Sequence, residues 1–335
     1  SILYSPFNHT DHHHNHHKNL TAYRPITGHV NLLGNGWFRN TWRLDNINNN
    51  NDGQTTDSLV MKTLRLEREF YDEFYDLHRR DAMAMERLTH SAFIMNVYGY
   101  CGQSALNELA DFASGDVANL RTFAKKLRHI NTPEATMLKL QVVAMLATGV
   151  THIHEVDYPQ GTNATMVHYD LNPDNIAITK GGRPKINDFN IAEFLRWDVV
   201  KQESCGFHGR LHEPWWRAPE EMYRDENIML DEKVDVYALC NLIHNVLTGH
   251  SPHGKIKPER VEEVRKEVAK GDRPSLPNEI RDSKDASVIA MREALDICYE
   301  ANPQKRGTSR DVAERLLITL AELKQKKKGK ESHHA

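Results

Sequence analysis

The sequence contains few cysteines, and their spacing excludes the usual cysteine-built scaffolds. The four cysteines of this 335-residue chain, Cys101, Cys205, Cys240 and Cys298, are scattered and form no CxxC pair. A structural zinc site or a dense disulfide framework normally needs paired or regularly spaced cysteines. We therefore expect free thiols rather than a disulfide or zinc framework.

The sequence also lacks a long apolar run and a strong charge of either sign. No run is predicted to span a bilayer, so no transmembrane segment is expected in this chain. The formal net charge of −3 favours neither nucleic acid nor an anionic membrane as a partner. The chain starts with Ser1 rather than Met, so we expect an upstream part to be missing. For the cellular compartment, the cytoplasm is the default expectation. A longer parent protein that is in the secretory pathway or anchored to a membrane is the alternative.

Both ends of the chain predict little packing. Residues 1–23 include the run HTDHHHNHHKN, whose histidines could chelate a transition metal. A disordered polar tail with no core to join is the simpler interpretation. Residues 324–335, KQKKKGKESHHA, are basic, and we expect them to be solvated.

The most informative stretch lies between residues 166 and 190. Two short β-type runs, 176–178 and 184–186, flank a Gly-Gly pair, and a hairpin there would bring Asn175 and Asp188 side by side. Their oxygens could hold Mg²⁺, with ATP phosphates filling the other positions. Asp170, on the same loop, could accept the proton of a hydroxyl nucleophile.

This stretch resembles the catalytic loop and DFG segment of eukaryotic protein kinases. HYDLNPDN, residues 168–175, is similar to the loop, and the dipeptide at 188–189 is similar to the start of DFG. The resemblance implies that Asp170 is the catalytic Asp and that Asn175 and Asp188 bind metal. It also implies ATP with Mg²⁺, or Mn²⁺ in its place, and a protein substrate. A regulatory protein partner is a further expectation.

Two upstream elements occur in the order that the family shows. Gly34-x-Gly36 lies between predicted strands 30–33 and 37–44 and resembles the Gly-rich phosphate loop, with Arg39 at its third glycine. The strand 58–62 ends on Lys62, which matches the lysine that holds the α- and β-phosphates. An ordinary hairpin turn and a surface lysine are the alternative interpretations.

A long amphipathic helix is predicted over residues 66–89, and its apolar stripe contains one acid. An inward-facing carboxylate needs a cation, and Lys62 is the expected partner of Asp81. Glu86 is the nearest rival but lies off the stripe. The stripe consists of Phe70, Phe74, Leu77, Asp81, Met85 and Leu88.

The segment after this helix is expected to contain the adenine-binding hinge. In the family's order the hinge falls near Leu109–Phe112, which would place Ala110 and Phe112 against the nucleotide. The chain then becomes mainly helical. Helices are predicted at 116–128, 134–155, 231–249, 258–270, 286–298 and 308–324.

The downstream half resembles the family in its architecture but departs from it near the catalytic loop. Ala218-Pro219-Glu220 matches the APE motif, Arg306 matches the arginine that pairs with that glutamate, and Asp235 matches the acid that ties its helix to the catalytic loop. Three positions depart from the family. Tyr169 replaces the HRD arginine, which argues against switching by a phosphorylated activation loop. Asn172 replaces a lysine and Glu213 a threonine. These two residues could be hydrogen-bonded, although a further carboxylate near Asp170 and phosphate is unfavourable by charge.

The resemblance implies an α+β, two-lobed protein-kinase fold in a divergent member of the Ser/Thr or tyrosine-kinase-like branch. The expected parts are a tail at 1–23, a small β-rich lobe with one long helix at 24–110, a larger helical lobe at 111–323 and a basic tail at 324–335. The expected activity is transfer of the ATP γ-phosphate to protein Ser/Thr hydroxyls. A pseudokinase scaffold and a small-molecule kinase are the alternatives.

Overall fold

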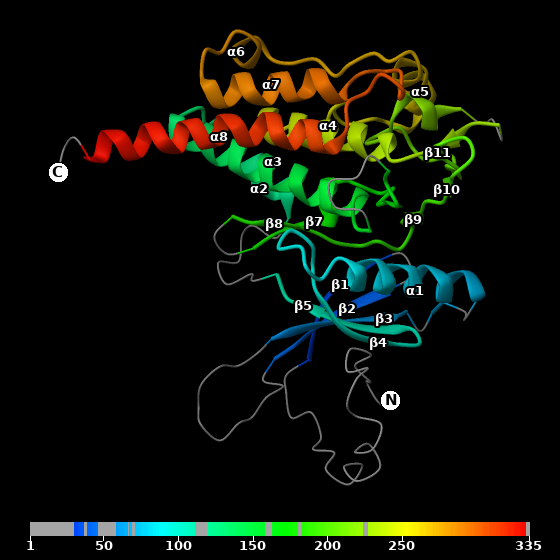
Figure 1. Ribbon diagram of the computed structural model, residues 1–335. Coiled ribbons are helices and arrows are strands. Elements are labelled where there is room, and N and C mark those ends of the chain that lie inside the picture. The colour runs from blue at the N-terminus through cyan, green and yellow to red at the C-terminus, as the bar shows by residue number, and fades with distance from the viewer. Residues whose placement is uncertain are drawn as a thin grey trace, which may run out of the picture. The chain divides into compact units, whose positions relative to one another are not determined.

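The chain folds into two compact units. The computed structural model describes residues 30–36, 39–45, 58–65, 67–68, 71–110, 119–157, 163–179, 182–223 and 227–332. The first unit contains the described residues up to His90, with 95–110 and 189–191, and the second contains the rest. One unit is built on a sheet and the other on helices, so the expected two-lobed α+β fold is confirmed (Figure 1).

The first unit is a five-stranded antiparallel sheet in the order β1-β2-β3-β5-β4. Exposure alternates along β3, so Val60, Lys62 and Leu64 lie buried on one face. The predicted strand therefore turns its lysine into the unit. The five strands are β1 Val30–Asn35, β2 Arg39–Leu44, β3 Leu59–Leu64, β4 Val97–Cys101 and β5 Ser104–Glu108.

One helix, α1 (Asp72–Arg87), packs against β4 in this unit. It begins later than the sequence predicts, at two acids, Asp72 and Glu73, which are favourable in a first helical turn. The predicted stripe is buried at each described position, including Asp81, while Phe70 lies outside the described residues. Amphipathic spacing thus gave the correct inner face but not the start of the helix.

The second unit is mainly helical, and its core lies among α3, α4, α7 and α8, which pack on one another (Figure 1). A helix lies in each of the six predicted segments. The helix in 116–128 is shorter than predicted, and residues 116–118 lie outside the described part of the chain. The last helix continues past residue 324 into the segment expected to be a tail, and the short helix Asn278–Arg281 was not predicted. The helices are α2 Leu120–Lys126, α3 Pro133–His154, α4 Lys233–Thr248, α5 Val261–Ala269, α6 Asn278–Arg281, α7 Ala286–Cys298 and α8 Ser309–Ser332.

Short antiparallel pairs and 3-10 turns complete this unit and carry the loops of the candidate site. The pairs are β6 Met166–Val167 with β9 Glu193–Phe194, β7 Ile176–Ile178 with β8 Pro184–Ile186, β10 Trp197–Asp198 with β11 Glu203–Ser204, and β12 Phe207–His208 with β13 Met229–Leu230. The 3-10 turns are η2 Pro173–Asn175, η3 Pro219–Met222 and η4 Pro258–Arg260.

Helix α3 is long and apolar enough to cross a bilayer when judged by length and composition alone, which the sequence analysis did not anticipate. However, 67% of the most apolar 18-residue segment of this helix is buried inside the protein. A helix in a protein core passes the same test, so α3 is weak support for a membrane span. Helix α4 is buried at every position from Val234 to Thr248, as its all-round apolar pattern predicts.

The expectation of free thiols is wrong for one pair of cysteines. Cys240 of α4 and Cys298 of α7 form a disulfide, with their Cα atoms 5.6 Å apart. Cys101 and Cys205 are free and exposed, as expected. The pair lies 58 residues apart in sequence, and only the packing of α4 on α7 brings the two sulfurs together.

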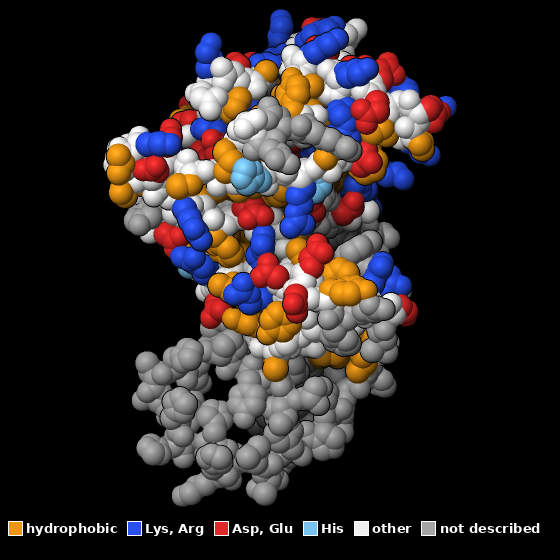
Figure 2. All heavy atoms as spheres, turned by 90° about the vertical axis from the view of Figure 1, so that its right-hand side faces the viewer, with side chains coloured by type: hydrophobic (Ala, Val, Ile, Leu, Met, Phe, Trp, Pro, Cys, Tyr) orange, Lys and Arg blue, Asp and Glu red, His pale blue; other side chains and the backbone are white. Residues whose placement is uncertain are grey.

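Both units carry charges of both signs on their surfaces. Figure 2 shows Lys and Arg interspersed with Asp and Glu over the described part of the face in view, without a large area of one sign. This mixture agrees with the small net charge of the chain.

Candidate functional site

In the first unit the candidate phosphate-binding lysine is paired as predicted. The Nζ atom of Lys62 lies 3.5 Å from Oδ2 of Asp81, and both side chains are buried. The rival acid, Glu86, instead accepts a hydrogen bond from the Tyr100 hydroxyl, at 3.4 Å. Asp81 of α1 therefore contacts the lysine of β3.

The structure adds a second cation that the sequence analysis did not assign to this pair. Arg39, from β2, donates through Nη1 to the same Oδ2 atom of Asp81 and is itself buried. The backbone N–H of Phe189 donates to Oδ1 at 2.6 Å. Burial raises the pKa of Asp81, but the charges of Arg39 and then Lys62 outweigh burial and hold the pKa below its ordinary value. The carboxylate is thus ionised between two cations.

Replacing Arg39 with Met is expected to lower the free energy of unfolding by about 2 kcal/mol, since a buried charge-assisted hydrogen bond is lost. The loss stays moderate because Lys62 still compensates Asp81. Urea denaturation would measure it, and Arg43→Met is the matched control. Arg43 lies on the same strand and pairs with Asp45 in a partly exposed contact, so its loss should cost less than about 1 kcal/mol. Equal costs for the two variants would contradict the prediction.

The predicted nucleotide-binding glycines and hinge residues are only partly described. Gly34 lies in β1 and Gly36 directly after it, where its N–H donates to the Arg39 carbonyl at 2.7 Å. Neither glycine has a positive φ, so backbone conformation does not require glycine there. Ala110 is buried just after β5, and Phe112 lies outside the described residues.

In the second unit the predicted hairpin is present and joins the two candidate metal ligands. Strands β7 and β8 pair in the predicted residues, and the N–H of Asn187 donates to the carbonyl of Asn175 at 2.9 Å. This bond sets Asn175 beside the residue that precedes Asp188. Asp188 itself has φ of 66°, a left-handed conformation that is uncommon outside glycine. Such local strain is concentrated at functional sites.

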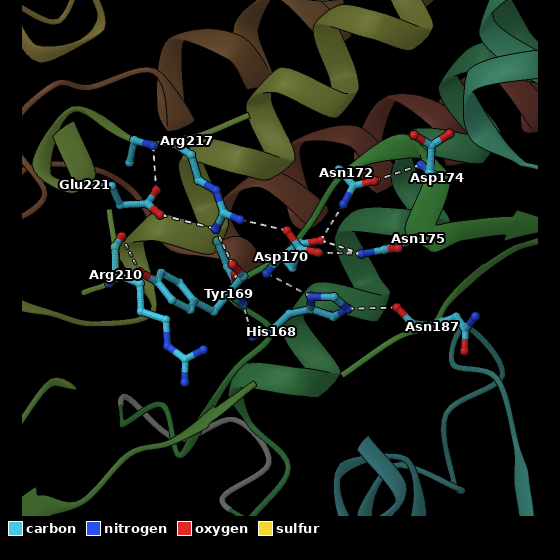
Figure 3. Close-up of polar contacts among 12 residues, drawn as sticks. His168, Tyr169, Asp170, Asn172, Asp174, Asn175, Asn187, Arg210, Arg217 and Glu221 are labelled. Atoms are coloured by element: carbon cyan, nitrogen blue, oxygen red, sulfur yellow. Dashed lines mark hydrogen bonds and ion pairs between the residues drawn. The ribbon is translucent and has the colours of Figure 1, made fainter. Parts of the chain in front are cut away.

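Asp170 lies next to Asn175, and both of its carboxylate oxygens have partners (Figure 3). Nδ2 of Asn175 donates to Oδ2 at 3.0 Å, and Nη2 of Arg217 donates to Oδ1 at 2.7 Å. Burial raises the pKa of Asp170, the charges of Arg217 and His168 oppose that rise, and the charge of Asp188 adds to it.

The possible hydrogen bond between Asn172 and Glu213 is not found among the described residues. Asn172 bonds within its own loop, donating to the Asp170 carbonyl at 3.1 Å and accepting from the Asp174 N–H at 3.0 Å. Glu213 is exposed. The residue that reaches the loop is Arg217, which sequence reasoning missed. Its only sequence signal was a cation directly before the Ala-Pro-Glu motif.

Tyr169, which stands where the family has arginine, fixes the segment around residues 207–212. Its ring makes edge contacts with Phe207 and His212, at centroid distances of 4.8 Å and 5.3 Å. Its hydroxyl accepts from the Arg210 N–H at 2.8 Å and lies 3.3 Å from the Arg210 carbonyl. Burial raises the pKa of Tyr169 to about 12, so the hydroxyl stays protonated. These contacts anchor the segment to Tyr169.

Two predicted architectural contacts are confirmed. Asp235 of α4 accepts the backbone N–H of His168 at 2.6 Å and of Tyr169 at 2.9 Å, which ties the helix to the catalytic loop. Arg306 forms a bidentate pair with Glu220, at 2.6 Å and 2.9 Å.

Several buried groups should make stability depend on pH. Burial lowers the pKa of His78, His212 and His253 to about 4 from an ordinary 6.5, and burial raises that of Glu221 to about 7 from 4.5. At pH values between about 4.5 and 6.5, the three histidines are protonated in the unfolded chain but not in the folded protein. Glu221 is protonated in the folded protein but not in the unfolded chain. Lowering the pH from about 7 to about 5.5 should therefore reduce the free energy of unfolding by about 2 kcal/mol.

Urea denaturation at the two pH values would measure this change. His253→Asn should flatten the pH dependence, because it removes one of the three histidines. A protein that gains stability as the pH falls over this interval would contradict the assignment.

Comparison with known proteins gives one family. Residues 32–318 match the protein kinase domain. Similar proteins include mouse ankyrin repeat and protein kinase domain-containing protein 1, 25% identical over 70% of this chain, and mouse receptor-interacting serine/threonine-protein kinase 4, 26% identical over 70%. Rat serine/threonine-protein kinase PAK 5 is 26% identical over 48% of this chain.

These relatives are much longer than the present sequence. The chain spans 28% of the length of each of the two mouse proteins and 20% of the rat protein. The family match itself covers most of the chain and includes every candidate site residue named above. The chain belongs to the protein kinase domain family.

Proposed function

We propose that this protein transfers the γ-phosphate of ATP to Ser or Thr hydroxyls of a protein substrate. The observation that carries this proposal is the hairpin that bonds Asn175 to Asn187, the residue before Asp188, with the Asp170 carboxylate hydrogen-bonded to Asn175. Asp170 orients the hydroxyl and accepts its proton, and Lys62 holds the nucleotide phosphates. We assign residues 24–110 and 111–323 to the two lobes, with Gly34, Gly36, Asp81, Ala110 and Phe112 serving nucleotide binding.

The donor set of the catalytic loop fits a hard divalent cation. Asn175 donates its Nδ2 hydrogens to Asp170, which leaves its Oδ1 atom to accept a metal, and Asp188 offers a carboxylate. The described residues contain no group of three or more His, Cys, Asp or Glu suited to a metal. Mg²⁺ is commonly held by one or two protein oxygens together with substrate phosphates and water. Mg²⁺, or Mn²⁺ in its place, would neutralise phosphate charge when bound.

A pseudokinase scaffold is the second candidate, and one observation favours it. Both Asp170 oxygens already accept hydrogen bonds, from Arg217 and Asn175, so a substrate hydroxyl must share one of them. Each carboxylate oxygen has a second lone pair, which keeps the base available. A small-molecule kinase is less well supported, because the Glu220–Arg306 pair fixes η3, which contains the segment that matches the APE motif of protein kinases.

Transfer of label from γ-labelled ATP, with Mg²⁺ and then Mn²⁺, would test this function. The acceptors would be the protein itself and a mixture of basic and acidic proteins. Asp170→Asn should abolish the label. Asp174→Asn is the matched control, since Asp174 lies on the same loop, is exposed and pairs with Arg121 instead. This variant should keep its activity within about threefold of wild type.

The outcomes separate the candidates. Label that persists in Asp170→Asn would show that Asp170 is not the base. Folded wild-type protein that transfers no label with either metal, yet is stabilised against heat by ATP, would be a pseudokinase. Label on a metabolite but on no protein would indicate a small-molecule kinase.

A further inference from the structure

The carboxylate of the proposed base is held by an arginine that lies 47 residues further along the chain. Arg217 comes from the segment that precedes η3 and donates from Nη2 to Oδ1 of Asp170 (Figure 3). Its side chain is only 12% exposed, against 31% for Asp170. This contact is therefore a partly desolvated ion pair, in which attraction is stronger than between fully exposed charges.

Arg217 is itself fixed by three further contacts. Its Nη1 atom donates to the Tyr169 carbonyl and lies 3.4 Å from Oε1 of Glu221. The guanidinium also lies over the Tyr169 ring, 5.3 Å from its centroid. Glu221 is anchored in turn, because it accepts the Ala218 N–H at 2.7 Å. The orientation of the guanidinium plane is thus set before any substrate binds, as electrostatic catalysis requires.

The loop around Asp170 needs a positive charge that it does not contain. Residues 170–175, DLNPDN, include two acids and no Lys or Arg. The charge of Asp188 acts on Asp170 as well. Bringing an anionic phosphoryl group toward these carboxylates is opposed by like-charge repulsion. Among the described residues, Arg217 is the cation in hydrogen-bond contact with Asp170.

We propose that Arg217 is a positioning residue of the phosphoryl-transfer site, which fixes the Asp170 carboxylate and supplies the positive charge that residues 170–175 lack. This inference rests on the proposed function. In a variant without Arg217, a positive charge could be restored at position 172, because the Asn172 side chain already donates to the Asp170 carbonyl at 3.1 Å. A lysine at 172 would extend from the same loop into the same surroundings.

The test compares kcat and the KM for ATP in wild type, Arg217→Met, Arg217→Lys, Asn172→Lys and the double variant Asn172→Lys/Arg217→Met. We expect Arg217→Met to lower kcat by about 100-fold while the KM for ATP changes by less than about threefold, because the lost interaction acts during transfer. Arg217→Lys and the double variant should each recover at least about tenfold.

Arg210→Met is the matched control for the loss of one positive charge from this segment. The side chain of Arg210 is exposed, and only its backbone contacts Tyr169, so kcat should stay within about twofold. Thermal unfolding of every variant would establish that the rates belong to folded protein.

Three results would overturn the inference. Arg217→Met that is as active as wild type, or more active, would make Arg217 a bystander or a block on Asp170, and the kinase activity would stand. Loss of activity that neither lysine restores would make its role structural. Activity in Asn172→Lys with none in wild type would show that Arg217 does not supply the charge. If every folded variant and wild type were inactive, the proposed function itself would fail.

Discussion

Replacing Arg306 with Met is expected to lower the free energy of unfolding by about 3–5 kcal/mol, because it removes one partner of a buried ion pair. The Arg306 side chain is fully buried, and its two Nη atoms bond both oxygens of Glu220. The variant leaves the largely desolvated Glu220 side chain without its cation. Urea denaturation, followed by tryptophan fluorescence and by circular dichroism, would measure the loss.

The loss should be large for a second reason. Arg306 also donates to three backbone carbonyls, those of Lys233, Glu300 and Ala301, at 2.7–3.2 Å. Its guanidinium lies 5.0 Å from the centroid of the Tyr237 ring. Met fills much of the volume but satisfies none of these acceptors, and an unsatisfied buried acceptor costs about 1–3 kcal/mol.

Arg315→Met provides the control for this prediction. Arg315 also contacts a glutamate through two nitrogens, but that pair with Glu293 is 32% and 48% exposed. Exposed pairs contribute little, so this variant should lose less than about 1 kcal/mol. If Arg306→Met lost no more than Arg315→Met, the ion pair would not stabilise the second unit as we infer.

The Glu220–Arg306 pair was predictable because both residues sit in motifs whose spacing is a property of the fold. The β7–β8 hairpin was also predictable, because two β-type runs on either side of a Gly-Gly turn are a local signal that fixes the strand register. Helix α7 was predicted at its observed bounds, 286–298, for a related reason. Asp285 caps its N-terminus by accepting from the N–H groups of Ser287 and Val288, so the start is marked in the sequence.

Long-range contacts that no motif marks were not predictable. Arg39 was interpreted as a change in a glycine loop, because the sequence does not show that a residue on β2 and one on α1 meet. Arg217 was missed because charge at Asp170 was sought within the loop and at Glu213. In both cases the unexpected partner is an arginine, whose length and several donors let it reach a carboxylate from a neighbouring element. Local periodicity assigns a face to a side chain, but not its partner.

The disulfide is the clearest case of such a contact, and its removal should have the second large effect. Replacing Cys240 and Cys298 together with Ala is expected to lower the free energy of unfolding by about 4 kcal/mol. The bridge closes a loop across a sequence separation of 58 residues, and chain-entropy arguments give this value for a loop of that length. Both residues are fully buried in the packing of α4 on α7, so the alanines also lose some contacts.

The measurement is urea denaturation with and without a thiol reductant. Reductant should bring wild type close to the double variant and leave the double variant unchanged. Cys101→Ala/Cys205→Ala is the matched control, because those thiols are free and exposed and their loss should cost less than about 0.5 kcal/mol. Thiol titration of the unfolded, unreduced protein gives an independent check, with two reactive thiols expected. Four reactive thiols, with no response of stability to reductant, would mean that Cys240 and Cys298 are packed but not bonded. The integrity of the α4–α7 core would then rest on burial alone.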